Sequence, residues 1–331
     1  MSYKHTVITD DISDVMIHPE PVFGKLKALW KEYLSGAGMP LSKWVSINQC
    51  IACNADDIYT FFSIWDYRYD RCRACASVFL NPQPPQSLYE AAFFDSPISA
   101  FINSPDVQNK YLDRFKKTIH PLLSEIMDGS GNNNMRILEV FGRNRHILDY
   151  LNSHQKVREY LRFQAGLKDE SGSSLSITRL DEVEDNSCNL ILLLMSVEQM
   201  RTPAEMLPIL SGKLTGDGRM VILARLGSGI DIQLLRGNNI SIFPLEHISL
   251  FSVEGYEHLC KRAGLEILEL STPGLLDTEY IRQHYQKHSE EDDVFQYFFK
   301  YRTQLDIKRL QQFIQEVRLS SALKLICKRI S

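Results

Sequence analysis

Four of the seven cysteines form two C-x-x-C pairs, Cys50-Ile51-Ala52-Cys53 and Cys72-Arg73-Ala74-Cys75, with 18 residues between them. A C-x-x-C turn presents two thiolates to one metal ion, and paired turns at this spacing are typical of tetrahedral zinc sites. We therefore predict a zinc ion held by Cys50, Cys53, Cys72 and Cys75. Because four protein ligands leave no open position for a substrate, its role would be structural. Unrelated core cysteines and a redox function are the alternatives.

The composition describes an ordinary folded protein. The chain has 331 residues, of which 44% are hydrophobic and 24% charged, a profile that fits about two globular domains. The 37 Lys and Arg against 41 Asp and Glu give a net charge of -4, which disfavours nucleic acid as the main partner because nucleic-acid binders carry a basic excess.

Membrane insertion and secretion are also disfavoured by the sequence. No apolar run approaches the roughly 18 residues that a bilayer span requires. The polar, acidic start MSYKHTVITDDISD lacks the basic and apolar segments of a secretory signal. We expect a cytoplasmic protein, and a reducing compartment favours metal binding over disulfides for the clustered thiols.

The chain divides into four regions by composition. Residues 1–43 are a leader with one helix at 21–34, and residues 44–85 form the zinc-binding module, which ends at the stiff segment Asn81-Pro82-Gln83-Pro84-Pro85. Residues 86–134 are a helical connector that ends in a Gly- and Asn-rich linker. Residues 135–331 are an α/β domain.

Strands and helices alternate after residue 135. Apolar strands are expected at 136–140, 157–163, 190–195, 219–226 and 265–270, with helices at 146–153, 204–214 and 253–263 and a turn at 215–218. This alternation predicts an open, mostly parallel sheet. One long aromatic-rich helix at 293–318 and a last strand at 322–330 follow. The aromatic stripe of this helix is typical of core, or of a helix that covers a partner subunit or a ligand cleft.

Several segments, in order, resemble those of one family. They are residues 67–84 with their Asn-Pro-Gln-Pro ending, Ile137-Leu138-Glu139-Val140, Ser196-Val197-Glu198-Gln199, residues 214–222 and His247-Ile248-Ser249-Leu250-Phe251-Ser252. Together they are similar to class I S-adenosylmethionine-dependent methyltransferases that carry an N-terminal zinc-binding segment, over about residues 50 to 270. The resemblance implies a Rossmann-like class I methyltransferase fold, with helices on both faces of the sheet and a small zinc-ribbon-like module. It also implies S-adenosylmethionine as cofactor and a small-molecule acceptor such as a sugar nucleotide or a secondary metabolite.

The cofactor loop departs from the pattern of that family. The resemblance leads us to expect an acidic residue, one further residue and then Gly-x-Gly-x-Gly, where this chain has Glu139-Val140-Phe141-Gly142-Arg143-Asn144-Arg145. Phe141, Arg143 and Arg145 replace glycines, and such side chains would narrow or fill the pocket for the methionine part of the cofactor. By the same resemblance, the cofactor contacts would come from Glu139, Phe141, Gly142, Gln164, Met195 and Ser196.

Two further positions differ from the family, and one matches. Gln164 follows the second strand where an acidic side chain usually accepts the ribose hydroxyls, and Gln199 stands where many relatives carry histidine, so a proton-transfer role is lost there. His247 matches a histidine that recurs before the Phe-Ser pair. It is our candidate catalytic residue, with a packing histidine as the alternative.

Three functions remain open. The first is an active methyltransferase with an unusual loop. The second is a catalytically inactive pseudo-methyltransferase that acts by binding a protein partner. The third is a fold reused for an anionic ligand, which Arg143 and Arg145 would bind at the start of a helix, unless both arginines simply face solvent. A homo-oligomer is compatible with each.

Overall fold

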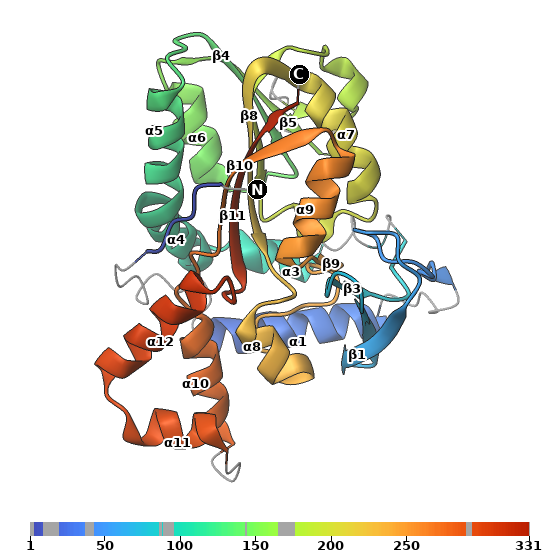
Figure 1. The fold of residues 1–331 in the computed structure, drawn as a ribbon, viewed down its shortest axis with the longest axis vertical. Helices are drawn as coiled ribbons and strands as arrows, with labels where there is room; N and C mark the ends of the chain where they lie inside the picture. The colour runs from blue at the N-terminus through green and yellow to red at the C-terminus, as the bar shows by residue number, and fades with distance from the viewer. Residues whose placement is uncertain are drawn as a thin grey trace.

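The computed structural model describes residues 3–8, 20–36, 43–85, 88, 96–142, 144–164, 176–288 and 293–330. Its centre is a seven-stranded sheet in the order β10-β11-β8-β7-β4-β5-β6 (Figure 1). The strands of this sheet are β4 (Met135–Val140), β5 (Val157–Phe163), β6 (Ser176–Ile177), β7 (Cys188–Leu194), β8 (Leu214–Arg225), β10 (Leu265–Ser271) and β11 (Ala322–Arg329).

The sheet is mostly parallel. Strand β4 pairs in parallel with β5 and β7, and β5–β6 and β7–β8 are also parallel. Strand β11 runs antiparallel to both of its neighbours, β8 and β10. The chain order reverses between β4 and β7, and ligands of open α/β sheets bind outside the carboxyl ends of the strands at such a point. The predicted Rossmann-like class I methyltransferase fold is confirmed.

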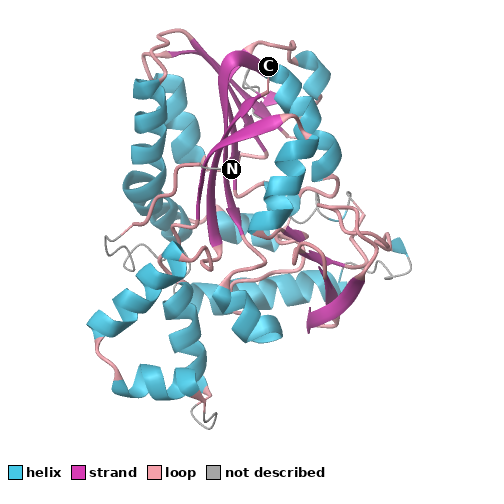
Figure 2. Ribbon diagram, in the orientation of Figure 1, coloured by secondary structure: helices cyan, strands magenta, loops and turns pink. Residues whose placement is uncertain are grey.

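Helices cover both faces of this sheet (Figure 2). One face carries α4 (Pro105–Arg114), α5 (His120–Gly129) and α6 (Arg145–Ser153), and the other carries α7 (Pro203–Lys213) and α9 (Val253–Arg262). Successive residues of β4 alternate between the two cores. Ile137 packs with Leu123 and Ile147 on the first face, whereas Leu138 packs with Leu207 and Leu259 on the second. Burial on both faces explains why these strands are apolar throughout.

A smaller antiparallel sheet lies beside the large one. It consists of β1 (Ile58–Ile64), β2 (Tyr67–Cys72), β3 (Val78–Leu80) and β9 (Ser249–Leu250). Strand β9 comes from the distant second half of the chain, so the N-terminal module is completed by a segment outside residues 44–85. The four regional boundaries expected from composition stay a prediction.

The remaining helices surround the lower end of the large sheet in Figure 1. They are α1 (Glu20–Gly36), which contains the predicted helix at 21–34, α3 (Pro97–Ile102), α8 (Ile230–Leu235), α10 (Asp277–Lys287), α11 (Val294–Tyr301) and α12 (Gln304–Glu316). No helix in the described part of the chain combines the length and apolar character that crossing a bilayer requires.

The single long helix predicted for residues 293–318 is wrong. The structure has two helices there, α11 and α12, with a break at Arg302 and Thr303. The Thr303 side chain accepts a hydrogen bond from the Asp306 amide, and the Asp306 carboxylate accepts one from the Thr303 amide at 3.0 Å. This reciprocal cap starts a new helix.

One other expectation also needs correction. The predicted turn at 215–218 lies inside strand β8, where the pairing register with β7 shifts after Cys188. A Cβ at Gly218 would lie 2.9 Å from the Cys188 carbonyl oxygen, so glycine permits this close approach. Within the expected leader, the Lys4 amide donates to the Leu268 carbonyl at the edge of β10 at 3.0 Å, and the leader assignment itself stays a prediction.

Candidate functional site

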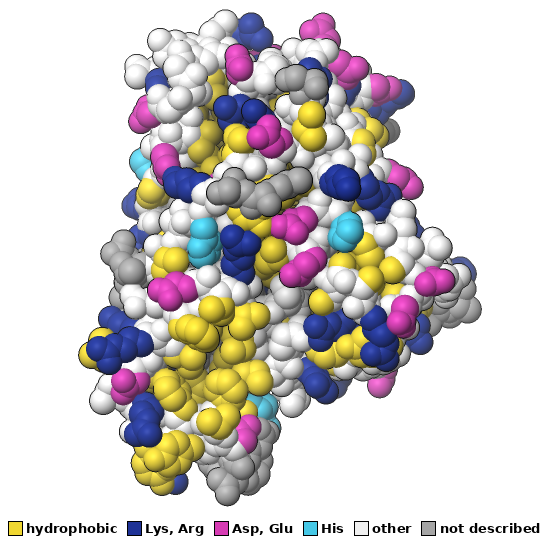
Figure 3. Space-filling model, viewed as in Figure 1, with side chains coloured by type: hydrophobic (Ala, Val, Ile, Leu, Met, Phe, Trp, Pro, Cys, Tyr) yellow, Lys and Arg dark blue, Asp and Glu magenta, His cyan; other side chains and the backbone are white. Residues whose placement is uncertain are grey.

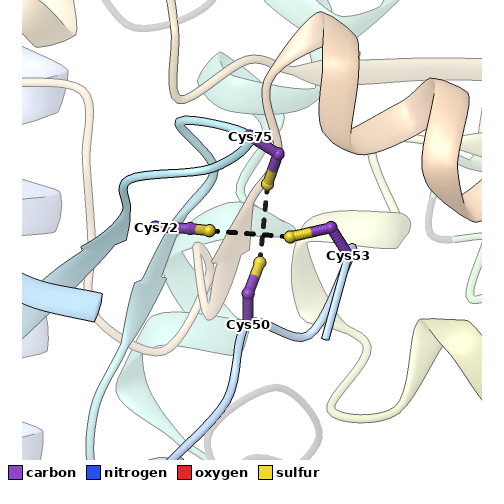
Figure 4. A group of neighbouring side chains, drawn as sticks. All are labelled: Cys50, Cys53, Cys72 and Cys75. Carbon is purple, nitrogen blue, oxygen red and sulfur yellow. Dashed lines mark hydrogen bonds between the residues drawn. The ribbon is translucent and has the colours of Figure 1, made fainter. Parts of the chain in front are cut away.

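The four predicted cysteines come together in one cluster (Figure 4). Cys50 and Cys53 lie in the turn before β1, Cys72 ends β2, and Cys75 lies in the turn that follows. The sulfur atoms of Cys50 and Cys75 are 3.5 Å apart, and those of Cys53 and Cys72 are 3.6 Å apart. Four thiolates about 2.3 Å from one metal ion would be separated by roughly 3.8 Å, so the cluster has the size of a tetrahedral metal site.

The chemistry of the cluster also suits a metal. Hydrogen bonding with Cys50, and to a lesser extent with Ser77, lowers the pKa of the Cys75 thiol to about 5. A thiol with such a pKa is a thiolate at neutral pH, which is the form that binds metal. The sulfur atoms of the other three cysteines lie within 4.8 Å of it and of one another. The residues present therefore fit a bound metal ion.

The cluster is anchored to the large domain through α9. The Ser252 hydroxyl, at the start of that helix, donates a hydrogen bond to the Cys75 carbonyl. Near its end, Arg262 Nη1 donates to the Ala52 carbonyl at 3.1 Å and to Asn54 Oδ1 at 3.0 Å. The cysteine turns are thus part of the packing between the two sheets.

Glu139, at the end of β4, is engaged inside the protein. Its side chain is fully buried and accepts hydrogen bonds from the Tyr160 hydroxyl and from Arg162 Nε, the latter at 3.1 Å. Burial raises the pKa of Glu139, and the charge of Arg162 opposes that rise. The predicted cofactor-binding carboxylate therefore already has two partners on the neighbouring strand β5.

The loop that follows is filled by its own side chains. Phe141 has a φ of +54°, the left-handed conformation that glycine adopts most easily, and its ring lies 5.6 Å from that of Phe163. A Cβ at Gly142 would lie 1.9 Å from Glu139 Oε2. The one glycine retained in this loop is thus required by the buried Glu139 side chain.

The other predicted cofactor contacts lie around this loop. Gln164 Nε2 donates to the Gly142 carbonyl at 2.9 Å, so its amide is directed at the loop itself. Met195, after β7, has a φ of +58° and is partly exposed. Ser196 is buried, and its hydroxyl has no hydrogen-bond partner among the described residues. The roles assigned to these residues from the sequence stay predictions.

The predicted anion site at Arg143 and Arg145 stays a prediction, and only Arg145 lies in the described part of the chain. Arg145 begins α6, and its side chain is 80% exposed and 3.8 Å from Asp149. The N-terminus of α6 is capped by Asn144, whose Oδ1 accepts from the His146 amide at 2.9 Å. Arg143 lies outside the described residues. An anion at this helix start would compete with the Asn144 cap.

Glu198 is a candidate that the sequence reasoning missed. It follows β7, it is fully buried, and its Oε1 accepts from the Arg225 amide at the end of β8 at 2.5 Å. Its Oε2 has no hydrogen-bond partner among the described residues, and burial raises the pKa of Glu198 to about 7. The signal in the sequence is an acidic residue that directly follows a buried strand.

His247 is connected to Glu198 through its neighbour Ile248, just before β9. The Ile248 amide donates to the Glu198 carbonyl at 2.8 Å, and His247 Nδ1 accepts from the Phe243 amide at 3.1 Å. Burial, and then the charge of Arg225, lowers the pKa of His247 to about 3. The imidazole is therefore neutral at physiological pH, with its proton on Nε2. Glu198 and His247 are thus two buried titratable groups near the carboxyl ends of β7 and β8.

Comparisons with known proteins were made by sequence and by structure. No protein-family model matches the chain, and no curated protein matches it in sequence. One similar solved structure is a complex between the Trm112 methyltransferase activator of Haloferax volcanii and a methyltransferase, with a TM-score of 0.43 at 10% identity over 67% of this chain and 95% of that one.

Two other similar structures are methyltransferases with bound ligands. The plantazolicin methyltransferase BamL, in complex with a triazolic desmethylPZN analog and SAH, has a TM-score of 0.42 at 14% identity over 72% of this chain and 92% of its own. Geranyl diphosphate methyltransferase in complex with SAM has a TM-score of 0.39 at 12% identity, over 73% of this chain and 95% of its own. At these values the fold assignment rests on the strand order of this chain itself.

Proposed function

We propose that this chain is a methyltransferase-fold protein that works by binding a partner and does not use S-adenosylmethionine as a methyl donor. The observation that carries the proposal is the state of Glu139, which is buried and bonded to Tyr160 and Arg162. S-adenosylmethionine carries a cationic sulfonium and an ammonium group, and both need acceptors in a protein pocket. The carboxylate expected to serve as one already accepts two hydrogen bonds from β5 on its Oε2.

Two neighbouring features support the same conclusion. Gln164 is uncharged and donates to the Gly142 carbonyl, so the position expected to accept ribose hydroxyls points its amide at the loop. Phe141 occupies the position of the first family glycine and packs on Phe163. The residues of the loop therefore do not fit the cofactor, and we derive no reaction step through it.

Calorimetric titration of the full-length, metal-loaded protein with S-adenosylmethionine and S-adenosylhomocysteine tests the proposal. We expect no binding heat up to millimolar ligand. Micromolar binding of either compound by the wild-type chain would overturn the proposal.

A gain-of-function variant shows whether the loop is the reason. Replacing Phe141, Arg143 and Arg145 together by glycine restores the Gly-x-Gly-x-Gly pattern but leaves Glu139 bonded to Tyr160 and Arg162. Binding of S-adenosylhomocysteine by this variant would assign the loss to the loop, and no binding would assign it to Glu139. A matched control carries three glycines at exposed positions of α12, Gln304→Gly, Lys308→Gly and Arg309→Gly, and should bind nothing.

An active methyltransferase is the second candidate, and one observation favours it. Glu198 and His247 are buried titratable groups at the carboxyl ends of β7 and β8, where the acceptor of a group-transfer reaction would lie. The acceptor would be a small molecule, such as the sugar nucleotide or secondary metabolite that the resemblance implies. Micromolar binding in the same calorimetric titration would select this candidate.

For the cysteine cluster we propose a structural zinc ion with Cys50, Cys53, Cys72 and Cys75 as ligands. Four sulfur ligands and a tetrahedral size are the preferences of zinc, and all four positions are filled by protein. When bound, the ion supplies a cross-link between the turns before β1 and after β2. Its presence is checked by elemental analysis of the purified protein, with one equivalent of zinc as the expected result.

A further inference from the structure

Helix α11 is apolar on two opposite sides. On one side, the rings of Phe295 and Phe299 pack against Tyr285 of α10 at 6.3 and 6.4 Å. On the other side, Val294, Tyr297 and Tyr301 are spaced three and four residues apart and are 72%, 53% and 57% exposed. A helix that is hydrophobic on more than one side is normally covered on each of them.

Helix α12 continues the exposed surface. Leu305, Phe313 and Val317, on or directly after this helix, are 56%, 55% and 43% exposed. With Val294, Tyr297 and Tyr301 they form what we call the arm face. These six account for half of the twelve large hydrophobic residues that are exposed in the described part of the chain. Figure 3 shows hydrophobic side chains gathered over α10 to α12, at the lower left of the molecule.

The place of the arm in the fold sets it apart from the core. Helices α10 to α12 are inserted between β10 and β11, and they project beyond the lower end of the large sheet (Figure 1). The arm face is therefore accessible to a large partner.

The size of the arm face fits a protein interface. Its six side chains expose on the order of 600 Å² of surface, taking about 150–220 Å² for each full side chain. That is at the upper end of the largest apolar patch found on a typical monomer, about 300–600 Å². One side of a standard protein interface covers about 800 Å², so the arm face and its rim would be sufficient.

The charges around the arm face favour a second copy of this chain. Lys300 Nζ lies 5.3 Å from the centre of the Tyr301 ring, and the Arg302 guanidinium lies 5.3 Å from that of Tyr297. Asp306 and Glu316 supply the opposite sign on α12, alongside the cationic Lys308 and Arg309 of the same helix. A surface with both signs at its rim is self-complementary, as a two-fold interface requires, whereas an anionic membrane would select a uniformly basic rim.

We propose that the arm face is the interface of a homodimer, in which the α11–α12 surfaces of two copies cover each other about a two-fold axis. The proposal is independent of the function proposed above, because no arm residue lies in the loop after β4 or in the cysteine cluster.

Sedimentation velocity of the full-length protein, from submicromolar to high micromolar concentration, is the test. We expect a dimer whose dissociation constant is weakened at least about a hundredfold by Tyr297→Glu with Phe313→Glu. Because both side chains are exposed, the double variant should keep its thermal unfolding midpoint. The matched control Ile209→Glu changes an equally exposed residue on α7 (50% exposed) and should leave the dimer intact.

Three results would overturn the proposal. One is a monomeric wild-type protein at every concentration. Another is a dimer that the double substitution does not weaken. The third is a wild-type monomer that co-sediments with vesicles of phosphatidylcholine and phosphatidylglycerol through the same residues, which would assign the arm face to a lipid surface.

Discussion

The cysteine cluster and the loop after β4 solve the problem of buried polar groups in opposite ways. In the cluster, four sulfur atoms face one another within 4.8 Å, and an ion from outside would satisfy them. In the loop, Glu139 accepts hydrogen bonds from Tyr160 and Arg162, and the apolar Phe141 ring packs beside Phe163. On the zinc proposal the first region depends on a bound ion for its stability, whereas the described residues of the second find their partners within the chain.

Removal of one cysteine ligand should have the largest effect on this contrast. Structural zinc contributes on the order of 10 kcal/mol to folding in small zinc domains, so we expect Cys72→Ser to lose its metal and to unfold or aggregate. Elemental analysis and thermal unfolding measure the two effects. Cys188→Ala, an equally buried cysteine outside the cluster, is the control. If the Cys72→Ser protein has a normal yield and a normal thermal unfolding midpoint, the fold does not depend on the metal.

The substitution Gly142→Ala tests whether the buried Glu139 side chain constrains the loop. The added methyl group would meet the Glu139 carboxylate at 1.9 Å, and such overpacking costs about 1–3 kcal/mol or more. In a Glu139→Ala background the same change should cost much less, because the obstacle is gone. Urea unfolding of the four proteins gives the coupling energy. Additive effects would show that Gly142 and Glu139 do not constrain each other.

Glu198 and His247 should make the folding stability depend on pH in opposite directions. The folded Glu198 pKa of about 7 exceeds the ordinary glutamate pKa of 4.5, so the folded state holds the extra proton and stability falls as pH rises from 4.5 to 7. His247, with a folded pKa of about 3 against the ordinary histidine pKa of 6.5, makes stability rise from pH 3 to 6.5. The two contributions oppose each other between about pH 4.5 and 6.5.

Glu198→Gln should leave only the histidine contribution. We expect the variant to gain stability relative to wild type by about 3 kcal/mol between pH 5 and pH 8. Urea unfolding at both pH values measures this gain. A stability difference between the two proteins that does not change with pH would mean that Glu198 does not titrate in this range.

The smallest effect is expected at Arg145. Its exposed pair with Asp149 at 3.8 Å is worth a few tenths of a kcal/mol at most, so Arg145→Ala should change stability by less than about 0.5 kcal/mol. Its affinity for inorganic phosphate, measured by calorimetry, should also be unchanged. A clear loss of phosphate affinity in Arg145→Ala would show that Arg145 takes part in an anion site.

The sequence was sufficient where residue spacing alone determines the structure. The two C-x-x-C pairs predicted the cysteine cluster, and the apolar strand at 157–163 matches β5. The break in the helix at 293–318 was also readable, because Thr303 and Asp306 have the spacing of a capping box.

The rest depends on contacts between distant residues. Nothing local to Glu139 shows that Arg162, on another strand, neutralises it, and nothing near Cys75 shows that β9 completes its sheet. The pKa of Glu198 is raised because elements far apart in the chain bury its side chain. Such properties arise from packing, which periodicity does not encode.

The pairing of β3 with β9 has a consequence for synthesis of the chain. Val78 and Phe79 find their sheet partners at Leu250 and Ser249, so the ribosome delivers all four cysteines long before it delivers the last strand of their sheet. Until then the edge of β3 stays open, and open edges recruit other chains. Truncated products that stop before residue 249 should therefore aggregate even when they have captured a metal ion.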